Sequence, residues 1–222
     1  MVNNLYTIII PVFNEKLKMK SLLGSLLPFH KKGHEILIID DGSTDGSAEI
    51  LIKCDFISLI SQYPNKGKGK AIIQGLRQAK HDKIIIFDGD LELNPTEIEK
   101  LMILDKAKNI NSVFGNRFNS FQLESIWDIG NKLLTLTFNW LNNSNVRDAL
   151  CCAKAFYKSD IEINSLSSKK FEIDVEITSI LVQTYPSVKN INLEYQRRTI
   201  QQGKKLRLNN SFSILLKIFE NS

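Results

Sequence analysis

The stretch KIIIFDGD at residues 83–90 ends a short apolar run in two carboxylates, and EILIIDD at residues 35–41 does the same earlier in the chain. Isoleucine-rich runs of this length are typical of strands that are buried on both faces of a parallel sheet. Both runs therefore bring their acids to the carboxyl edge of the sheet, where open α/β folds bind their ligands. Two carboxylates one residue apart, Asp88 and Asp90, suit a divalent metal that also holds a diphosphate.

Strand and helix signals alternate through the first half of the chain. Strands separated by helices of this length predict an α/β fold with a Rossmann-like, mostly parallel central sheet flanked by helices. The predicted strands are residues 6–10, 35–39, 56–61, 83–87 and 188–195. The predicted helices are residues 17–27, 47–52, 70–80, 96–106, 126–141, 173–182 and 211–219.

The composition indicates one substantial hydrophobic core and a modest basic excess. The 222 residues are 43% hydrophobic, and 29 basic against 24 acidic side chains give a net charge of +5. This charge fits phosphate-bearing ligands or an anionic membrane surface, and we expect no nucleic-acid partner because no nucleic-acid-binding module is visible. The three cysteines have no metal-ligand spacing, which favours a reducing compartment. We find no signal-peptide pattern and no apolar run long enough to span a bilayer.

Two loops at the predicted sheet edge carry candidate nucleotide-binding residues. The first offers an aromatic ring for stacking and a carboxylate for a ribose or a base, and its proline is expected to end the pairing of the strand. The second contains two acids and glycines that permit positive φ angles. The candidates in these two loops are Pro11, Phe13, Glu15, Asp40, Asp41 and Gly42.

A third loop, NKGKGK at residues 65–70, combines lysines with glycines just before a predicted helix. Glycine-rich backbone, positive charge and a helix N-terminus together favour anionic groups, so Lys70 is a further candidate for nucleotide binding. The loop is not a Walker sequence, because the GKS or GKT element is missing at the start of the helix.

Taken in order, IIIPVFNE, IIDDGSTDGS, NKGKGKA and FDGDLELNP resemble the motifs of family-two glycosyltransferases of the GT-A fold. The resemblance is greatest to the polyprenyl-phosphate (dolichyl-phosphate) hexose synthases, and it runs from Thr7 to about Leu208. It implies that Asp88 and Asp90 bind Mg²⁺ or Mn²⁺ bridging the diphosphate, with Glu92 beside the metal. It also assigns Pro11, Phe13, Glu15 and Asp41 to the nucleotide.

Later segments resemble the lipid-phosphate branch of the same family. They are GNRF at 115–118, DALCCAKAF at 148–156, FEIDVE at 171–176, EYQRRT at 194–199 and GKKL at 203–206. The resemblance implies that Arg117 reaches a phosphate, that Arg198 and Lys204 belong to a loop over the phosphates, and that Asp148 is an acid near the reacting centre. With the metal ligand Asp90, these four residues are the expected catalytic set.

Three departures from the family pattern stand out. Phe13 replaces a more common tyrosine, Cys152-Ala153 replaces Gly-Phe, and Gln201-Gln202 stands where relatives often carry an acid. The chain also lacks the Q-x-x-R-W signature of processive polysaccharide synthases, which argues against a polymerising enzyme.

The resemblance implies an inverting, metal-dependent transfer of a hexose from a UDP- or GDP-sugar to a polyprenyl phosphate. We expect one domain over 1–208, with a nucleotide and metal half at about 1–115 and an acceptor half at about 116–208, and an amphipathic tail at 209–222. The expected location is the cytoplasmic face of a membrane. The helix at 126–141 either packs on the sheet or meets lipid, and a membrane-embedded partner subunit is an alternative anchor.

Three other functions remain open from the sequence. The first is a glycosyltransferase acting on a sugar hydroxyl in glycan or surface-polysaccharide assembly, which needs a general base. The second is a nucleotidyltransferase on a similar sheet, which would release pyrophosphate. The third is a non-catalytic subunit that binds a nucleotide sugar or a lipid phosphate.

Overall fold

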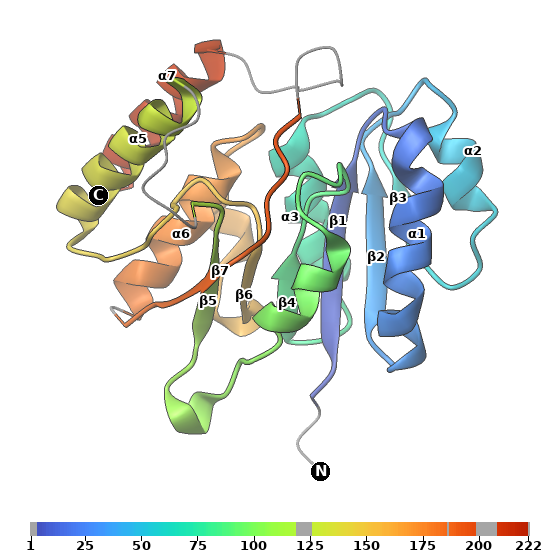
Figure 1. The fold of residues 1–222 in the computed structure, drawn as a ribbon, viewed down its shortest axis with the longest axis horizontal. Helices are drawn as coiled ribbons and strands as arrows, with labels where there is room; N and C mark the ends of the chain where they lie inside the picture. The colour runs from blue at the N-terminus through green and yellow to red at the C-terminus, as the bar shows by residue number, and fades with distance from the viewer. Residues whose placement is uncertain (1–3, 119–125, 186, 199–207, 222) are drawn as a thin grey trace.

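Figure 1 shows a computed structural model of the chain, in which helices cover both faces of a central sheet. The structure describes residues 4–118, 126–185, 187–198 and 208–221. The strands are β1 (Tyr6–Val12), β2 (Glu35–Asp40), β3 (Ser58–Ser61), β4 (Lys83–Ile86), β5 (Ser112–Asn116), β6 (Lys154–Tyr157) and β7 (Lys189–Asn192). The helices are α1 (Lys16–Lys31), α2 (Ser47–Ile52), α3 (Lys68–Gln78), α4 (Ile98–Leu101), α5 (Ile126–Asn142), α6 (Ile173–Thr184) and α7 (Leu208–Glu220).

The described strands form one seven-stranded sheet in the order β3-β2-β1-β4-β6-β5-β7. β1, β2, β3 and β4 pair in parallel, and β5 pairs in parallel with β7. Only β6 runs against its neighbours β4 and β5. The predicted α/β class with a mostly parallel sheet is therefore confirmed.

Each face of the sheet has its own hydrophobic core. Ile8 and Ile10 of β1 pack on one face with buried side chains of α1, α2 and α4. Ile9, between them, points to the other face and packs with α3, α5, α6 and α7. This alternation follows from the two-residue period of a strand, and it explains why the sequence runs are continuously apolar.

Strands β5 and β6 were not predicted from the sequence. β6 has only four residues, and its first residue is a lysine, which interrupts the apolar pattern. Lys154 is nevertheless 1% exposed, because its ammonium group donates to the Cys151 carbonyl and lies 4.0 Å from Asp174. The contact with Asp174 joins distant parts of the chain and leaves no signal in the local pattern.

The helix predicted over 96–106 is much shorter in the structure. A 3₁₀ turn at Pro95–Glu97 leads into α4, which ends at Leu101. The backbone N–H of Leu104 donates to the Tyr6 hydroxyl at 3.1 Å, so this group serves a contact with β1 instead of a helical bond. Propensity is overridden here by packing against the sheet.

Pro11 does not end the pairing of β1, which continues with β2 to the pair Val12–Asp40. The pairing with β4 ends two residues before the proline, at Ile9–Ile86. Pro11 has the same orientation as Ile9, whose carbonyl accepts from Phe87 on the β4 side. The missing N–H therefore falls where the ladder has already ended, and costs no hydrogen bond.

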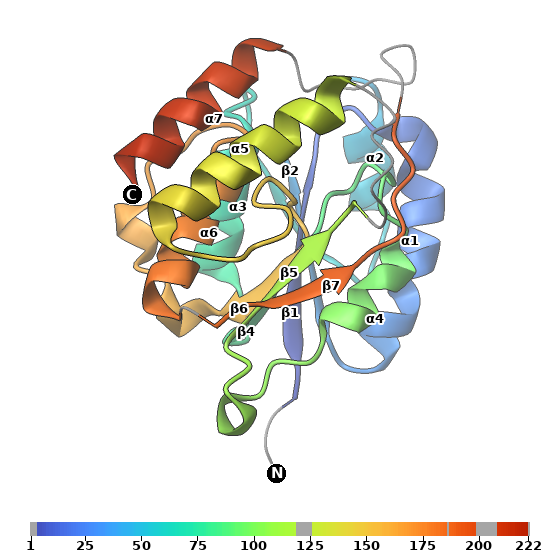
Figure 2. The ribbon, with the colours of Figure 1, turned by 60° about the vertical axis from the view of Figure 1, so that its left-hand side comes forward.

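Helices α5 and α7 lie side by side on one face of the sheet (Figures 1 and 2). Their inner sides contribute Phe138, Ile214 and Ile218 to the core. Their outer sides carry large exposed apolar side chains, which on α5 are Ile129, Leu133, Leu136 and Trp140 and on α7 are Phe212, Leu216 and Phe219. None of the helices within the described ranges is both long and apolar enough to span a bilayer.

Candidate active site

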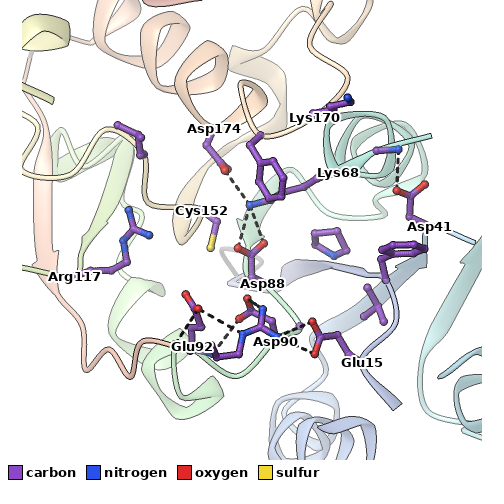
Figure 3. A pocket seen from close by; sticks show the side chains of 18 of the residues that line it. Glu15, Asp41, Lys68, Asp88, Asp90, Glu92, Arg117, Cys152, Lys170 and Asp174 are labelled. Atoms are coloured by element: carbon purple, nitrogen blue, oxygen red, sulfur yellow. Dashed lines mark hydrogen bonds and ion pairs between the residues drawn. The ribbon is translucent and has the colours of Figure 1, made fainter. Parts of the chain in front are cut away.

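A cavity of about 330 Å³ opens at the carboxyl ends of β1, β2 and β4 and extends toward α5, α6 and α7. Charged side chains from distant parts of the chain converge on it, as Figure 3 shows. The predicted site residues in its lining are Pro11, Phe13, Glu15, Asp41, Asp88, Asp90, Glu92, Arg117 and Arg198.

Four predicted residues do not line this cavity: Asp40, Gly42, Lys70 and Asp148. The Asp40 carboxylate accepts from the Ser43 N–H at 3.2 Å and so shapes its own turn. Gly42 has a φ of 77°, and a Cβ there would lie 2.9 Å from a backbone nitrogen. Lys204, the fifth expected catalytic residue, lies outside the described residues.

The glycine-rich loop at 65–70 uses its backbone amides within the protein. The N–H groups of Lys66 and Gly67 each donate to Asp41 at 2.8 Å, one to each carboxylate oxygen. The amides of Gly69 and Lys70 donate to the carbonyl of Lys169. These four amides are therefore bonded within the protein and are not open to an anionic ligand in this structure.

Lys68 is the cation of this loop that enters the cavity (Figure 3). Its ammonium group lies 2.9 Å from both Asp88 Oδ1 and Asp174 Oδ2. Burial would raise the pKa of Asp88, but Lys68 and a hydrogen bond from Cys152 outweigh it and hold that pKa below its ordinary value. Asp88 is therefore kept as an anion.

Asp90 sits in a different electrostatic environment. Burial first, and then the neighbouring Asp88 charge, raise its pKa from 3.8 to about 6, although Arg198 works in the opposite direction. The chain turns sharply after it, because Leu91 adopts a φ of 58°, a conformation uncommon for leucine. Strained residues of this kind are often found at functional sites.

Arg198 is the centre of the acidic side of the cavity. Its Nη1 lies 2.9 Å and 3.1 Å from the two oxygens of Glu15, its Nη2 contacts Asp90, and its Nε is 3.5 Å from Glu92. The residue is 8% exposed, and these carboxylates raise its pKa against the effect of burial. One guanidinium thus connects the expected nucleotide acid with the expected metal acids.

Glu92 holds the segment that carries Arg198. Its two carboxylate oxygens accept from the Tyr195 hydroxyl at 2.9 Å and from the Arg198 N–H at 3.1 Å. The N–H of Glu194 donates to Glu97, and Leu93 forms a β-bridge with Tyr195. The loop at 88–97, which carries the expected metal acids and is called the metal-acid loop below, is therefore held to the segment 193–198 by hydrogen bonds and a β-bridge.

Arg117 approaches the cavity from the end of β5 and pairs with Asp148 (Figure 3 shows Arg117). Asp148 is fully buried and faces Arg117, not the cavity. Burial would lower the pKa of Arg117, but Asp148 raises it well above its ordinary value. Asp148 therefore takes part in the site through its ion pair with Arg117.

Lys68, Cys152 and Asp174 were not among the predicted site residues, yet all three line the cavity. The sequence contained a signal for Asp174, because it belongs to the FEIDVE segment. Lys68 was missed because α3 begins two residues earlier than predicted, which makes Lys68 the first residue of the helix; Lys68 lines the cavity and Lys70 does not.

The residues present fit a divalent metal that also binds a diphosphate. Asp88 and Asp90 offer hard oxygen ligands in one cavity, and Mg²⁺ commonly takes one or two carboxylates together with substrate phosphates. Within the described ranges no three acidic, cysteine or histidine side chains form a metal-binding group, and Glu92 turns to Tyr195 and Arg198. The described residues therefore form no site in which protein side chains alone would surround a metal ion.

A family model described as "Glycosyl transferase family 2" matches residues 7–162. The chain belongs to this family. It is accordingly a transferase with the GT-A fold, and the predicted glycosyltransferase activity class is confirmed.

Two curated relatives are undecaprenyl-phosphate 4-deoxy-4-formamido-L-arabinose transferases. The protein of Photorhabdus laumondii is 28% identical over 91% of this chain and 69% of its own length. That of Pseudomonas fluorescens is 30% identical over 70% of this chain and 48% of its own length. The chain is thus similar to transferases whose names specify a polyprenyl phosphate.

Among solved structures, the chain resembles glucosyl-3-phosphoglycerate synthase of Mycobacterium tuberculosis. One crystal structure of that enzyme has a TM-score of 0.76 and 17% identity, with 99% of this chain and 81% of the other covered. Another, in complex with Mn²⁺, UDP and glucosyl-3-phosphoglycerate, has a TM-score of 0.71 and 16% identity, with 99% and 80% covered. At this identity the likeness shows the fold alone.

Proposed function

We propose that this glycosyltransferase moves a sugar from a nucleotide sugar to a polyprenyl phosphate, with inversion and with a divalent metal. The observation that carries the proposal is the mixed lining of the cavity. Acids and cations that suit a nucleoside diphosphate and its metal line it together with the apolar side chains of Leu150, Phe171 and Ile214. The names of the curated relatives agree with a lipid-phosphate acceptor.

The residues that line the cavity have different roles in this reaction. The bond from the anomeric carbon to the diphosphate breaks as a bond to an acceptor phosphate oxygen forms on the opposite face. Mg²⁺ or Mn²⁺ held by Asp88 and Asp90 would supply Lewis-acid stabilisation of the leaving diphosphate. Arg117 and Arg198 line the same cavity and provide positive charge for the phosphates.

The acceptor chemistry explains why the site needs no general base. A phosphate is already anionic near neutral pH, so it attacks without losing a proton. Asp148, the acid expected near the reacting centre, is buried against Arg117 and does not line the cavity. We therefore give Asp148 the role of holding Arg117, and Glu92 that of holding Arg198.

The nucleotide would lie over the ends of β1 and β2. Phe13, Glu15 and Asp41 line this part of the cavity, where a ring and two carboxylates suit a base and a ribose. We keep the division proposed from the sequence, with the nucleotide and metal half at about 1–115 and the acceptor half at about 116–208. The tail at 209–222 contributes Ile214 to the cavity wall.

The acceptor's lipid places the reaction at a membrane, and we propose that α5 and α7 bind to the bilayer surface on its cytoplasmic side. Trp140 is 80% exposed, Phe212 66% and Leu133 63%. An outward apolar face on amphipathic helices is typical of binding in the plane of a membrane interface. A membrane-embedded partner subunit is the other occupant that would cover this face.

Vesicle sedimentation distinguishes direct binding to the bilayer surface from binding to a membrane-embedded partner subunit. Wild-type protein should sediment with anionic vesicles, and a Leu133→Glu/Trp140→Glu variant should remain in the supernatant. Lys158→Glu, a charge change elsewhere on the chain, is the control. Wild type that stays in the supernatant at low salt would favour the partner subunit.

Transfer of radiolabelled sugar into organic-extractable lipid tests the activity itself. UDP-glucose, UDP-N-acetylglucosamine, GDP-mannose and the UDP derivative of 4-deoxy-4-formamido-L-arabinose are each offered with undecaprenyl or dolichyl phosphate, with Mg²⁺, Mn²⁺ or EDTA. Metal-dependent label in the lipid phase is the expected result, and it identifies the sugar. Release of nucleoside diphosphate without a lipid product would show that the acceptor is a different molecule.

A further inference from the structure

The two acids of the expected metal site are already engaged by the protein. Lys68 lies 2.9 Å from Asp88 Oδ1 and 3.0 Å from Asp88 Oδ2. In Asp90, Oδ1 accepts from the Glu92 N–H at 3.0 Å, and Oδ2 contacts Arg198. Each of the four oxygens that a metal would use therefore has a partner, and two of the partner groups are cations.

A metal ion bound to these oxygens would lie beside an ammonium and a guanidinium. Like charges a few ångströms apart repel strongly where water is largely excluded. Both cations line the same cavity, and Arg198 is 8% exposed. One of the two cations therefore has to move away from the acids when a metal ion binds.

Lys68 is anchored independently of the metal acids. It begins α3, and its ammonium group lies 2.9 Å from Asp174 Oδ2. If the metal takes Asp88, Lys68 still has a buried carboxylate as its partner.

Arg198 is less completely satisfied. Its Nε is buried, and no described residue offers it an acceptor with hydrogen-bond geometry, since Glu92 Oε1 is 3.5 Å away. Its other contacts are with Glu15 and Asp90, at the expected nucleotide and metal positions. A buried donor without an acceptor suggests a second arrangement in which it is bonded.

The cluster keeps an excess of negative charge even with its own cations. Five carboxylates face four cationic groups, which leaves one negative charge. The carboxylates are Glu15, Asp88, Asp90, Glu92 and Asp174, and the cations are Lys18, Lys68, Lys154 and Arg198. A divalent cation is therefore attracted to the cluster as a whole while it is repelled by Arg198 at short range.

We propose that Arg198 is a resident counterion of the metal site. It holds Asp90 in place in the absence of donor, and it exchanges this contact for the diphosphate when metal and donor bind. The inference rests on the proposed function, because it needs a metal and a diphosphate at this cavity. The exchange of Arg198 from Asp90 to the diphosphate makes metal and nucleotide bind with positive coupling, since each favours the same position of Arg198.

Metal-binding affinity tests this directly, without any measurement of activity. The dissociation constant for Mn²⁺ is measured by calorimetry at fixed pH, alone and with saturating UDP or GDP. We expect Arg198→Ala to bind Mn²⁺ alone roughly tenfold more tightly than wild type, a change of about 1.4 kcal/mol. The tightening caused by nucleotide should shrink by a similar factor. Damage to the fold would weaken Mn²⁺ binding. Tighter binding by Arg198→Ala therefore indicates the exchange of Arg198, and weaker binding indicates a structural role for it.

Arg197→Ala is the matched control. Arg197 is the neighbouring residue and lines the same cavity, but it pairs with Asp128 instead of the metal acids. We expect its Mn²⁺ affinity to stay near that of wild type. Arg198→Lys keeps the charge and should give an intermediate affinity, which serves if the alanine variant does not fold.

The outcomes separate the inference from the proposed function. Unchanged Mn²⁺ affinity in both Arg198 variants, or an equal gain in Arg197→Ala, would overturn the exchange of Arg198 and leave the metal site intact. A wild-type protein that binds no Mn²⁺ with either nucleotide would overturn the metal-dependent function and the inference together.

Discussion

Arg117 and Asp148 form a bidentate ion pair, with Arg117 Nε 2.7 Å from Asp148 Oδ2 and Nη2 3.0 Å from Oδ1. Because Asp148 is fully buried and both its oxygens are used, it orients a cation and does not face a substrate. The two parallel hydrogen bonds fix the plane of the guanidinium as well as its position.

Replacement of Asp148 by asparagine should therefore act through Arg117. We expect Asp148→Asn to lower the free energy of unfolding by roughly 3 kcal/mol, because a buried cation loses its charged partner. Activity should fall, but the acidic limb of kcat/KM against pH should stay at the same pH. Loss of that limb would instead show that Asp148 is a general base.

Asp90 is expected to weaken the fold while it serves the reaction. Its pKa in the folded protein is about 6, above the ordinary 3.8, so the folded state holds this proton more tightly than the unfolded chain does. The ionised carboxyl therefore costs stability that grows as the pH rises from 3.8 to about 6 and is complete above it.

Asp90→Asn should be more stable than wild type at pH 8 by about 1–3 kcal/mol in the absence of metal, with little difference near pH 4. Transfer should be abolished, because a metal ligand is lost. Chemical denaturation at the two pH values and the lipid-label assay check this. A variant with full activity would falsify the assignment of Asp90 to the metal.

Lys68 connects Asp88 with Asp174, and both acids depend on it. Lys68→Met should lower the free energy of unfolding by about 3 kcal/mol, since it leaves the buried carboxylate of Asp174 and the partly exposed one of Asp88 without their shared cation. Without Lys68 the pKa of Asp88 should rise, because burial is then opposed by less positive charge. The pH dependence of Mn²⁺ binding measures this, and the binding midpoint should move to higher pH.

Gly69 allows a close approach of two backbone segments. A Cβ at this position would lie 2.4 Å from the carbonyl oxygen of Ser168, so Gly69→Ala should destabilise the fold by about 1–3 kcal/mol. Gly24, exposed on α1 with no atom within 4 Å of an added Cβ, is the control. Gly24→Ala should stabilise the protein by about 0.5–1 kcal/mol. Thermal denaturation of the two variants should give shifts of opposite sign.

The parts of the fold that the sequence predicted are those with a local pattern. β1, β2 and β4 were recognisable because burial on both faces makes them continuously apolar. Asp88 and Asp90 were recognisable as site residues because a strand end fixes where they lie. No local pattern marks β6, whose lysine is paired with Asp174 from helix α6.

For a similar reason, the sequence could not predict which charged residues of the site form ion pairs with each other. Arg198 meets Glu15 across 183 positions of chain, and Lys68 meets Asp174 across 106. A motif identifies a charged residue but does not say which opposite charge it faces. The loop at 65–70 shows the same limit, because its glycines fit the approach of residues 168–170 as well as they would fit a phosphate.

The joined segments 92–97 and 193–198 limit how such enzymes can be recombined. The family match ends at residue 162, while Tyr195 and Arg198, which hold the metal-acid loop, come after it. A chimera joined at that boundary would combine the acids of one parent with the counter-charges of another. Exchange of acceptor specificity between relatives therefore requires that both segments be inherited from the same parent.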